Sequence, residues 1–243
     1  SEKSYYIRWG DNEVRVLSRG EEFSRCRHVS DGYELLKSLG HRRTALHPSL
    51  VQLKTDAAYP RALKGVRAQA QLHLSVGGNE IAKSRGELQF TETGLSGPAA
   101  FDISRAVACL AEDSDIRCDF LVDYSLDDIK ALLYERKRTA PDMNAEDILV
   151  GILHNRLGKM LVKYAGVSGM TRLCELSDED IIRIAASCKD FTVKAYGVEG
   201  FDSAQVTAGG IKTSGVKPET MESRYVKGLF ICGEVLDIDA DCG

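Results

Sequence analysis

The strongest pattern of apolar and polar positions in the chain is a strict alternation from Val66 to Val76. Every second residue of this segment is apolar, and a polar residue stands at each position between. Such an alternation predicts a β-strand with one buried side and one solvent-facing side. The triplet Gly-Gly-Asn at 77–79 can adopt positive φ, and a second strand-like segment follows over 80–90. We therefore expect an antiparallel hairpin in a half-exposed sheet.

Other segments with strand character lie towards both ends of the chain. A second hairpin is predicted near the start, where "GDN" separates Tyr5–Trp9 from Val14–Leu17. Further strands are predicted over 118–124, 191–198, 203–211 and 228–235. Because glycines interrupt the last three, we expect them to be short and to end in turns.

Two helices are predicted before residue 111 from their terminal residues. The first covers 34–39, with Ser30 as its N-cap and Gly40 in the left-handed conformation that ends many helices. The second follows Pro98, which suits a first helical turn, and Ser96 is its predicted cap.

A helical region is predicted over 123–187. Its helix starts are marked by a cap residue with an acid three positions later: Ser125 with Asp128, Asn144 with Asp147, and Ser177 with Asp180. The longest apolar stripe runs from Ile148 to Tyr164. We expect an α+β fold in which a small helical bundle is inserted into a sheet-based frame.

Composition and charge exclude several classes of protein. Charged residues make up 28% and hydrophobic residues 43% of the 243, as in ordinary globular domains. The net charge of −4 argues against nucleic acid as a partner, and no apolar run approaches the ~20 residues that span a bilayer. Seven cysteines without a C-x-x-C spacing fit a reducing compartment, so a cytoplasmic location is expected.

Few residues suggest chemistry of their own. Ser96 lacks the glycine two residues later that a serine nucleophile elbow requires, and the five histidines are dispersed. Asp237, Asp239 and Asp241 alternate, but the glycine and glutamate of a calcium loop are missing. We therefore predict no metal site and assign no catalytic residue. Glycines at predicted strand ends, in "VTAGGI" and "FICGEV", could let a flat ligand approach the backbone, although ordinary turns also account for them.

Two long motifs resemble a known family. "GELQFTETGLSGPAAFDISR" at 86–105 and the segment from Ala204 to Gly243 are similar to the HI0933-like family of bacterial FAD-dependent flavoproteins, which includes NAD(FAD)-utilising dehydrogenase-like, aminoacetone-oxidase-like and bile-acid-reductase-like proteins. "DGYELLKSLGH" and "LHPSLVQL" fit the same family, so the resemblance extends from residue 31 to the end.

The resemblance implies an antiparallel β-barrel-like domain with a helical insert, between remnants of a Rossmann-type FAD-binding domain. The implied boundaries are 1–43 for a partial FAD segment, 44–122 with 188–202 for the β-rich domain, 123–187 for the helical subdomain and 203–243 for the C-terminal FAD segment. It also implies that the FAD fingerprint lies upstream of residue 1. We therefore expect a fragment of an FAD-dependent oxidoreductase that passes hydride or electrons through the flavin, inactive by itself, with NAD(P)H as a further candidate cofactor.

Cofactor-binding residues are implied at two motifs. Gly233 and Glu234 match a strand-end pair that places a carboxylate near the ribityl hydroxyls of FAD, after a buried strand at 229–232. Asp237 and Gly243 belong to the same motif. Gly209 and Gly210 match a turn that approaches the edge of the flavin ring.

The implied partners are a small-molecule substrate and the remaining FAD-binding lobe of the parent chain. A homo-oligomer formed through the surface normally covered by that lobe is a further hypothesis. An alternative function also stays open, because the chain contains neither G-x-G-x-x-G nor a P-loop motif. In that alternative it is a cofactor-free module that binds a small molecule or a protein.

Overall fold

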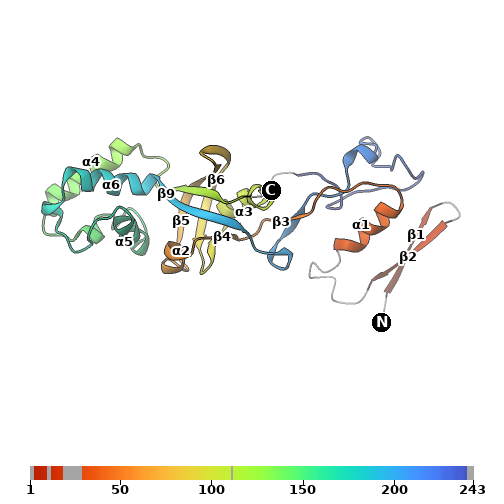
Figure 1. Ribbon diagram of the computed structural model, residues 1–243, viewed down its shortest axis with the longest axis horizontal. Helices are drawn as coiled ribbons and strands as arrows, with labels where there is room; N and C mark the ends of the chain where they lie inside the picture. Colours follow the sequence, from red (N-terminus) through yellow and green to blue (C-terminus); the bar gives the residue numbers. More distant parts are fainter. Residues whose placement is uncertain (1–2, 10–11, 19–28, 111, 240–243) are drawn as a thin grey trace. The chain divides into compact units, whose positions relative to one another are not determined.

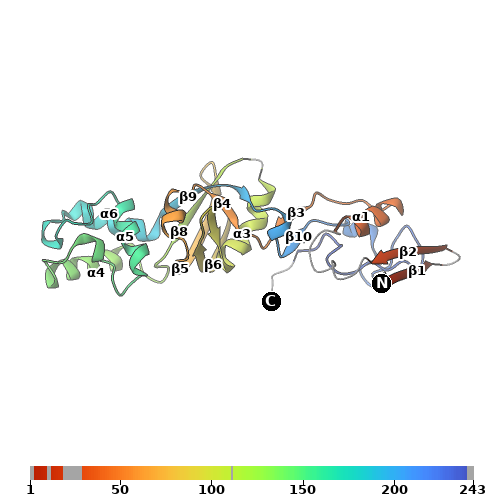
Figure 2. The ribbon, with the colours of Figure 1, turned by 90° about the horizontal axis from the view of Figure 1, so that it is seen from below.

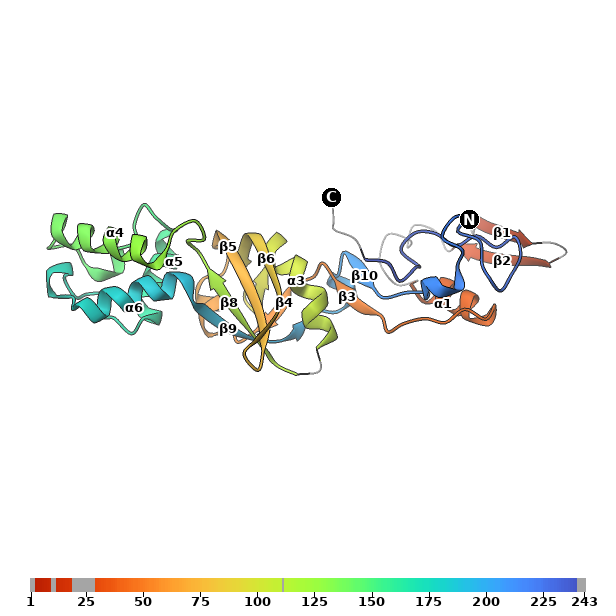
Figure 3. The ribbon, with the colours of Figure 1, turned by 90° about the horizontal axis from the view of Figure 1, so that it is seen from above.

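The computed structural model describes residues 3–9, 12–18, 29–110 and 112–239, with side chains from residue 32 onward. The chain divides into two compact units, one formed by 1–49 with 200–243 and the other by 50–199. Figures 1, 2 and 3 show the elements of each unit from three directions. The two units do not separate the barrel from the helices, both of which lie in 50–199. The finer division into four segments expected from the sequence therefore stays a prediction.

Residues 50–199 contain a closed antiparallel barrel. Its strands follow the order β4-β7-β6-β5-β8-β9 around the barrel, and β4 pairs with β9 to close it. The strands are β4 (Leu53–Thr55), β5 (Arg67–Val76), β6 (Asn79–Phe90), β7 (Gly94–Ser96), β8 (Ser114–Asp119) and β9 (Phe191–Val198). The barrel and its helices confirm the α+β fold class and the barrel-like domain.

The hairpin predicted from the alternating pattern is confirmed as β5 and β6. Gly77 and Gly78 take φ values of 56° and 83° between the two strands, as the turn prediction requires. The alternation also sets which side is buried, because Ala70, Leu72 and Leu74 are inaccessible in β5. The polar side chains between them face outward.

One strand of the barrel lies earlier than predicted. Strand β8 ends at Asp119, whereas the sequence pattern predicted a strand over 118–124. The backbone of 121–124 forms hydrogen bonds with side chains and within its own turn, where the Tyr124 amide donates to Leu121 O, and not with a neighbouring strand. Asp119 accepts a hydrogen bond from the Leu121 amide at 2.9 Å, and Lys189 donates to the carbonyls of Leu121 and Tyr124 at 2.9 and 2.8 Å. These contacts turn the chain out of the barrel.

Two helices belong to the barrel itself, α2 (Ala58–Ala62) and α3 (Pro98–Cys109). Pro98 begins α3 as predicted, but the N-cap is Gly97 at φ 90° and no side chain caps this helix. The prediction of Ser96 as the cap is wrong, because Ser96 is the last residue of β7. Helix α3 covers one side of the barrel (Figure 3).

Three further helices lie on the other side of the barrel (Figures 1 and 2), and their starts were partly predicted. They are α4 (Leu126–Thr139), α5 (Asn155–Tyr164) and α6 (Asp178–Lys189). Ser125 with Asp128 and Ser177 with Asp180 form complete capping boxes, which confirms these two helix starts. Asn144 makes no side-chain cap and precedes only the 3₁₀ turn η2 (Ala145–Asp147), so that predicted start is wrong.

The apolar stripe from Ile148 to Tyr164 is interrupted instead of forming one helix. Gly151 takes φ 80°, which α-helical backbone does not allow, and α5 begins only after His154. The His154 side chain caps α5 by accepting a hydrogen bond from the Arg156 amide. Ile148 and Leu149 are nevertheless buried, because the turn before α5 packs into the same core. A second 3₁₀ turn, η3 (Leu173–Glu175), precedes α6.

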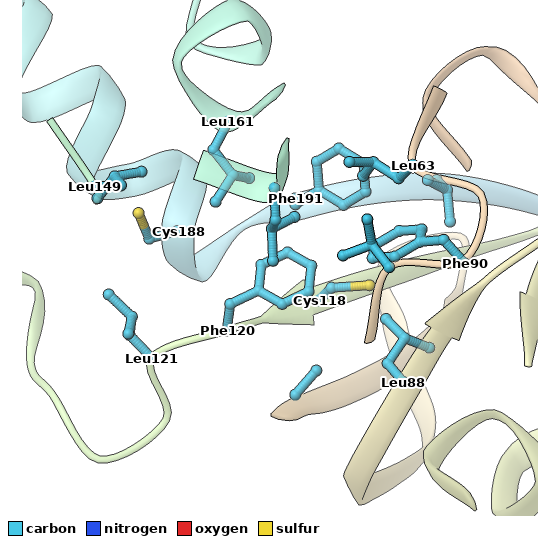
Figure 4. Packing of buried hydrophobic residues seen from close by; sticks show 14 of the residues in the cluster. Leu63, Leu88, Phe90, Cys118, Phe120, Leu121, Leu149, Leu161, Cys188 and Phe191 are labelled. Atoms are coloured by element: carbon cyan, nitrogen blue, oxygen red, sulfur yellow. The ribbon is translucent and has the colours of Figure 1, made fainter. Parts of the chain in front are cut away.

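The barrel and the three helices share one apolar core. Figure 4 shows Phe90, Phe120 and Phe191 together with Leu149 and Leu161 of the helical region. The Phe120 and Phe191 ring centroids lie 5.9 Å apart, and the Phe90 and Phe191 centroids 6.4 Å apart. Such ring spacings are typical of favourable aromatic contacts. The helical region is therefore packed onto the barrel and is not attached only by its connections.

The unit formed by 1–49 and 200–243 contains little regular structure. Its elements are β1 (Lys3–Trp9), β2 (Asn12–Ser18), α1 (Val29–Ser38), β3 (His47–Ser49), β10 (Val206–Ala208) and the 3₁₀ turns η4 (Phe201–Ser203) and η5 (Thr213–Gly215). Strands β1 and β2 form the predicted N-terminal hairpin, and β10 pairs with β3. Helix α1 starts earlier than predicted, and Gly40 after it has the expected positive φ of 91°.

The strand predicted over 228–235 is absent from the described structure. Only single bridges occur there, from Phe230 to Glu222 and from Leu236 to Ile211. Burial still alternates along 229–231, because Leu229 and Ile231 are buried and Phe230 is exposed. These side chains pack in a small core with Tyr33, Leu36, Ile211, Val216 and Leu236.

Three broader expectations can be compared with the described residues. None of the described helices is both long and apolar enough to span a membrane. Within the same residues, no group of three or more His, Cys, Asp or Glu side chains is placed to hold a metal ion. The described cysteines are free thiols, of which Cys118 and Cys188 are buried.

Candidate functional site

Three distant segments meet in the unit formed by 1–49 and 200–243, and two of them carry the predicted cofactor residues. Ile211 lies between Arg43 on one side and Leu236 on the other, in an antiparallel and a parallel bridge. The Ile211 amide donates to Val235 O at 2.8 Å, and the Asp237 amide donates to Ile211 O at 2.9 Å. On the other side, the Thr44 amide donates to Gly210 O at 2.9 Å. We call this arrangement of 42–45, 209–212 and 233–237 the junction.

Gly209 and Gly210 lie at the closest approach of these segments. Gly209 has φ 86°, and a Cβ at this residue would clash with the carbonyl oxygen of Ala45. A Cβ on Gly210 would lie 2.6 Å from Leu236 C and 2.7 Å from Val235 O. The chain's own backbone therefore accounts for both glycines. Their predicted contact with a flavin ring stays a prediction.

Gly233 and Glu234 have different surroundings. Gly233 takes φ 80° in an exposed turn, and the nearest 4 Å around the place of a Cβ contain no other described atom. Glu234 is also exposed, and its carboxylate has no hydrogen-bond or ion-pair partner among the described side chains. Asp237 is half-buried beside Ile211. Gly243 lies outside the described residues.

Tyr33, on α1, brings a buried phenol to this edge of the junction. Its hydroxyl donates a long hydrogen bond of 3.5 Å to the Glu234 carbonyl. Burial raises the pKa of Tyr33; the nearby Arg43 lowers it, and the Glu234 and Asp237 carboxylates raise it. The Arg43 guanidinium lies 5.6 Å from the centre of the Tyr33 ring. Tyr33 therefore stays protonated at neutral pH and can donate a hydrogen bond.

Neither Tyr33 nor Arg43 was predicted from the sequence. Tyr33 looks like an ordinary apolar residue of a short helix, and Arg43 stands in a segment without a recognisable pattern. The only sequence clue was the "DGY" of the family-like motif around α1. The contacts with 234–237 arise from residues about two hundred positions away, which periodicity within α1 does not reveal.

The junction fits part of a cofactor such as FAD. Hydroxyl groups of a ribityl chain need acceptors, and the carboxylate of Glu234, which has no partner among the described side chains, is such an acceptor on an exposed turn that begins with a glycine. Gly233 leaves open space beside it. A diphosphate cradle of the G-x-G-x-x-G type is not part of the sequence. The described residues therefore fit one side of the cofactor.

Comparison with known proteins identifies the family. Residues 47–206 match the family model described as "HI0933-like protein barrel and H2TH domain". The chain belongs to the HI0933-like family. The matched residues cover the barrel, its helices and the start of the 203–243 segment, in agreement with the resemblance found in the sequence.

Curated relatives of this HI0933-like chain include a reductase and two synthases. A 3-dehydro-bile acid delta(4,6)-reductase of Clostridium scindens is 34% identical over 218 residues, which are 87% of this chain and 53% of that protein. Ribosomal RNA dihydrouridine synthases of Escherichia coli and Haemophilus influenzae are 31% and 28% identical, each over 63% of this chain and over 37% and 36% of their own lengths. The chain thus spans about half the length of the first relative and less of the other two. An oxidoreductase-related domain is established by these matches.

Proposed function

We propose that this HI0933-like chain forms the substrate-side part and one side of the cofactor site of an FAD-dependent reductase. The observation that carries the proposal is the 34% identity with the bile-acid reductase over 87% of the chain. The junction supports it with the exposed Glu234 carboxylate, the open turn at Gly233 and the protonated phenol of Tyr33.

The reaction class follows from what the relatives' names share. A delta(4,6)-reductase and a dihydrouridine synthase both reduce a carbon–carbon double bond. In a 3-oxo steroid diene and in uridine alike, that double bond is conjugated to a carbonyl group. We infer the same class of reaction here, in which a hydride equivalent adds to the electrophilic end of the reduced double bond, the β-carbon of an enone or the δ-carbon of a dienone, and a proton adds to the other carbon of that bond. When bound, the flavin supplies the hydride.

This chain's own residues bind and orient the reactants. Glu234 accepts hydrogen bonds from cofactor hydroxyls, and Gly233 lets the cofactor approach the backbone. The Asp237 amide is held by Ile211, which fixes the turn from 233 to 237 against the junction. The packed barrel and helices give a rigid body on which a substrate surface can be built.

A small molecule is the favoured substrate class, and an RNA base is the second candidate. The match to the bile-acid reductase is longer and of higher identity than those to the RNA-modifying synthases. The net charge of −4 gives no general attraction to a polyanion.

Expression of the complete reading frame that contains this chain tests the proposal. We expect a yellow protein with the absorption bands of oxidised flavin. After anaerobic reduction with dithionite, a 3-oxo-4,6-diene steroid should reoxidise the flavin, and the product should contain two additional hydrogens by mass spectrometry. A saturated 3-oxo steroid is the control and should leave the flavin reduced.

A colourless protein that also fails to bind added FAD would contradict the flavin proposal and favour the cofactor-free binding module. A flavoprotein reoxidised by unmodified ribosomal RNA and not by the dienone would support the second substrate class.

A further inference from the structure

A cationic hollow is formed by α1 and two segments of the junction, and Glu234 is not among its lining residues. It has a volume of about 400 Å³ and is lined by Tyr33, Glu34, Lys37, His41, Arg42, Arg43 and Lys212. All of these residues belong to the unit formed by 1–49 and 200–243. The volume is in the range of small-molecule sites.

The charge of the hollow is largely uncompensated. Four cationic side chains and a single carboxylate line it. The carboxylate, Glu34, lies 3.9 Å from Lys37, and both side chains are exposed. Arg42 and Lys212 are exposed, and no described carboxylate lies within ion-pair distance of either. Two exposed cations at one hollow, with no counter-ion among the described residues, favour an anionic ligand.

Backbone pairing keeps these two cations together. The Lys212 amide donates to Arg42 O at 2.9 Å, and Arg43 is bridged to Ile211. Arg42 and Lys212 therefore come from two segments of the junction that are joined directly by a backbone hydrogen bond. A site built on paired backbone loses little conformational entropy when a ligand binds.

His41 is a buried lining residue of the same hollow, and its Nδ1 is inaccessible and lies against Gly215, away from a ligand. Its Nε2 lies 2.8 Å from Ser223 Oγ, which also accepts the amides of Tyr225 and Val226, each at 3.0 Å. Since the serine oxygen already accepts twice, we infer that its own hydrogen is donated to His41 Nε2. Burial lowers the pKa of His41, so the ring is neutral and its hydrogen is on Nδ1. Nδ1 has no hydrogen-bond partner among the described atoms.

A second hollow, in the unit formed by 50–199, also contains cationic side chains, but most of them are paired. It has a volume of about 450 Å³ and contains Arg156, Lys159, Lys163 and Glu146 among its lining residues. Lys159 is paired with Glu146 at 2.7 Å and with Asp147 at 3.4 Å. Arg156 donates to the carbonyls of Ala62 and Lys64. Among the described cations of this hollow, only Lys163 has neither a carboxylate nor a carbonyl partner. This hollow is therefore not an anion site of the same kind.

We propose that the hollow of Lys37, Arg42, Arg43 and Lys212 binds the phosphate or diphosphate group of a nucleotide-sized ligand. Arginine offers a planar fork of donors that matches phosphate oxygens, and lysine adds a point charge. A phosphate carries more negative charge and more acceptor oxygens than a carboxylate. It can therefore interact with several of the cationic side chains that line the hollow. The proposal rests on the charge and geometry of this hollow and not on the flavin reaction.

Titration calorimetry of the chain with inorganic pyrophosphate at low ionic strength tests this site. We expect saturable binding that weakens as salt is added. The double substitution Arg42→Gln with Lys212→Gln should weaken binding by about tenfold or more, since charge-assisted hydrogen bonds are lost. The matched control Lys163→Gln removes an exposed cation of the second hollow and should leave the affinity unchanged. Circular dichroism checks that the variants keep the fold.

Absence of binding at millimolar pyrophosphate would overturn the proposal, as would equal losses of affinity in the double variant and the control.

Parallel titrations with ADP and FAD identify the source of the phosphate. Competition between FAD and pyrophosphate would assign the hollow to the cofactor, whereas binding of ADP without such competition would assign it to a second nucleotide. A chain that binds pyrophosphate but belongs to a colourless parent protein would retain this inference and remove the flavin proposal.

Discussion

Single residues of the junction have functions that their sequence context only partly revealed. The glycines at 209, 210 and 233 all stand out in the sequence, because glycine weakens a strand and marks a turn, a bulge or a close approach of another group. Sequence could not distinguish a glycine needed by the chain's own backbone from one that leaves room for a ligand. That difference depends on Ala45 and Leu236, which approach Gly209 and Gly210 only in the folded unit.

Substitution of Gly209 by alanine should destabilise the junction much more than the same substitution at Gly233. Both residues have positive φ, 86° and 80°, so each variant incurs the cost of about 1–2 kcal/mol for a Cβ in left-handed backbone. Only at Gly209 does the new Cβ meet a carbonyl oxygen, which adds an overpacking cost of about 1–3 kcal/mol. Hydrogen exchange of peptides covering 42–49 and 206–212 measures the difference. Similar protection in the two variants would show that the junction relaxes around the methyl group.

At the scale of elements, the predictions were accurate where a pattern acts locally. The β5–β6 hairpin and the starts of α4 and α6 depend on neighbouring residues, and all three were found in the sequence. The strand predicted over 228–235 was wrong because alternation of Leu229, Phe230 and Ile231 sets burial but does not supply a partner strand. The apolar stripe from Ile148 to Tyr164 does not form one helix, because Gly151 takes a positive φ of 80° and α5 begins only at Asn155.

The three cap motifs give a direct comparison between elements. Ser177 accepts a hydrogen bond from the Asp180 amide at 3.1 Å, while Asn144 makes no side-chain cap before its 3₁₀ turn. Ser177→Ala should therefore lower the free energy of unfolding by about 1 kcal/mol. Asn144→Ala should change it by less than about 0.5 kcal/mol. Urea unfolding followed by circular dichroism measures both, and a loss at Asn144 equal to that at Ser177 would contradict the assignment of the caps.

For the whole molecule, the two units differ in how they are built. Residues 50–199 are continuous in sequence, and their barrel and helices share a large apolar core. The other unit combines 1–49 with 200–243 and has a smaller core of buried residues. A continuous segment with its own core has the properties of an independent folding domain.

Residues 50–199 expressed alone should therefore fold cooperatively. Phe120 and Phe191 pack against each other where the barrel continues into the helices, so neither part has a complete core without the other. We expect a single urea transition in which the helical circular dichroism signal and the hydrogen exchange of β5 and β6 are lost together. Phe191→Ala is expected to destabilise both parts by about 3–5 kcal/mol, because this side chain is fully buried.

The control is Phe201→Ala in the complete chain. Phe201 lies outside 50–199 and is 38% exposed, so its loss should leave the urea transition of the barrel and helices unchanged. Separate transitions for the helices and the barrel would show that the shared core does not couple them.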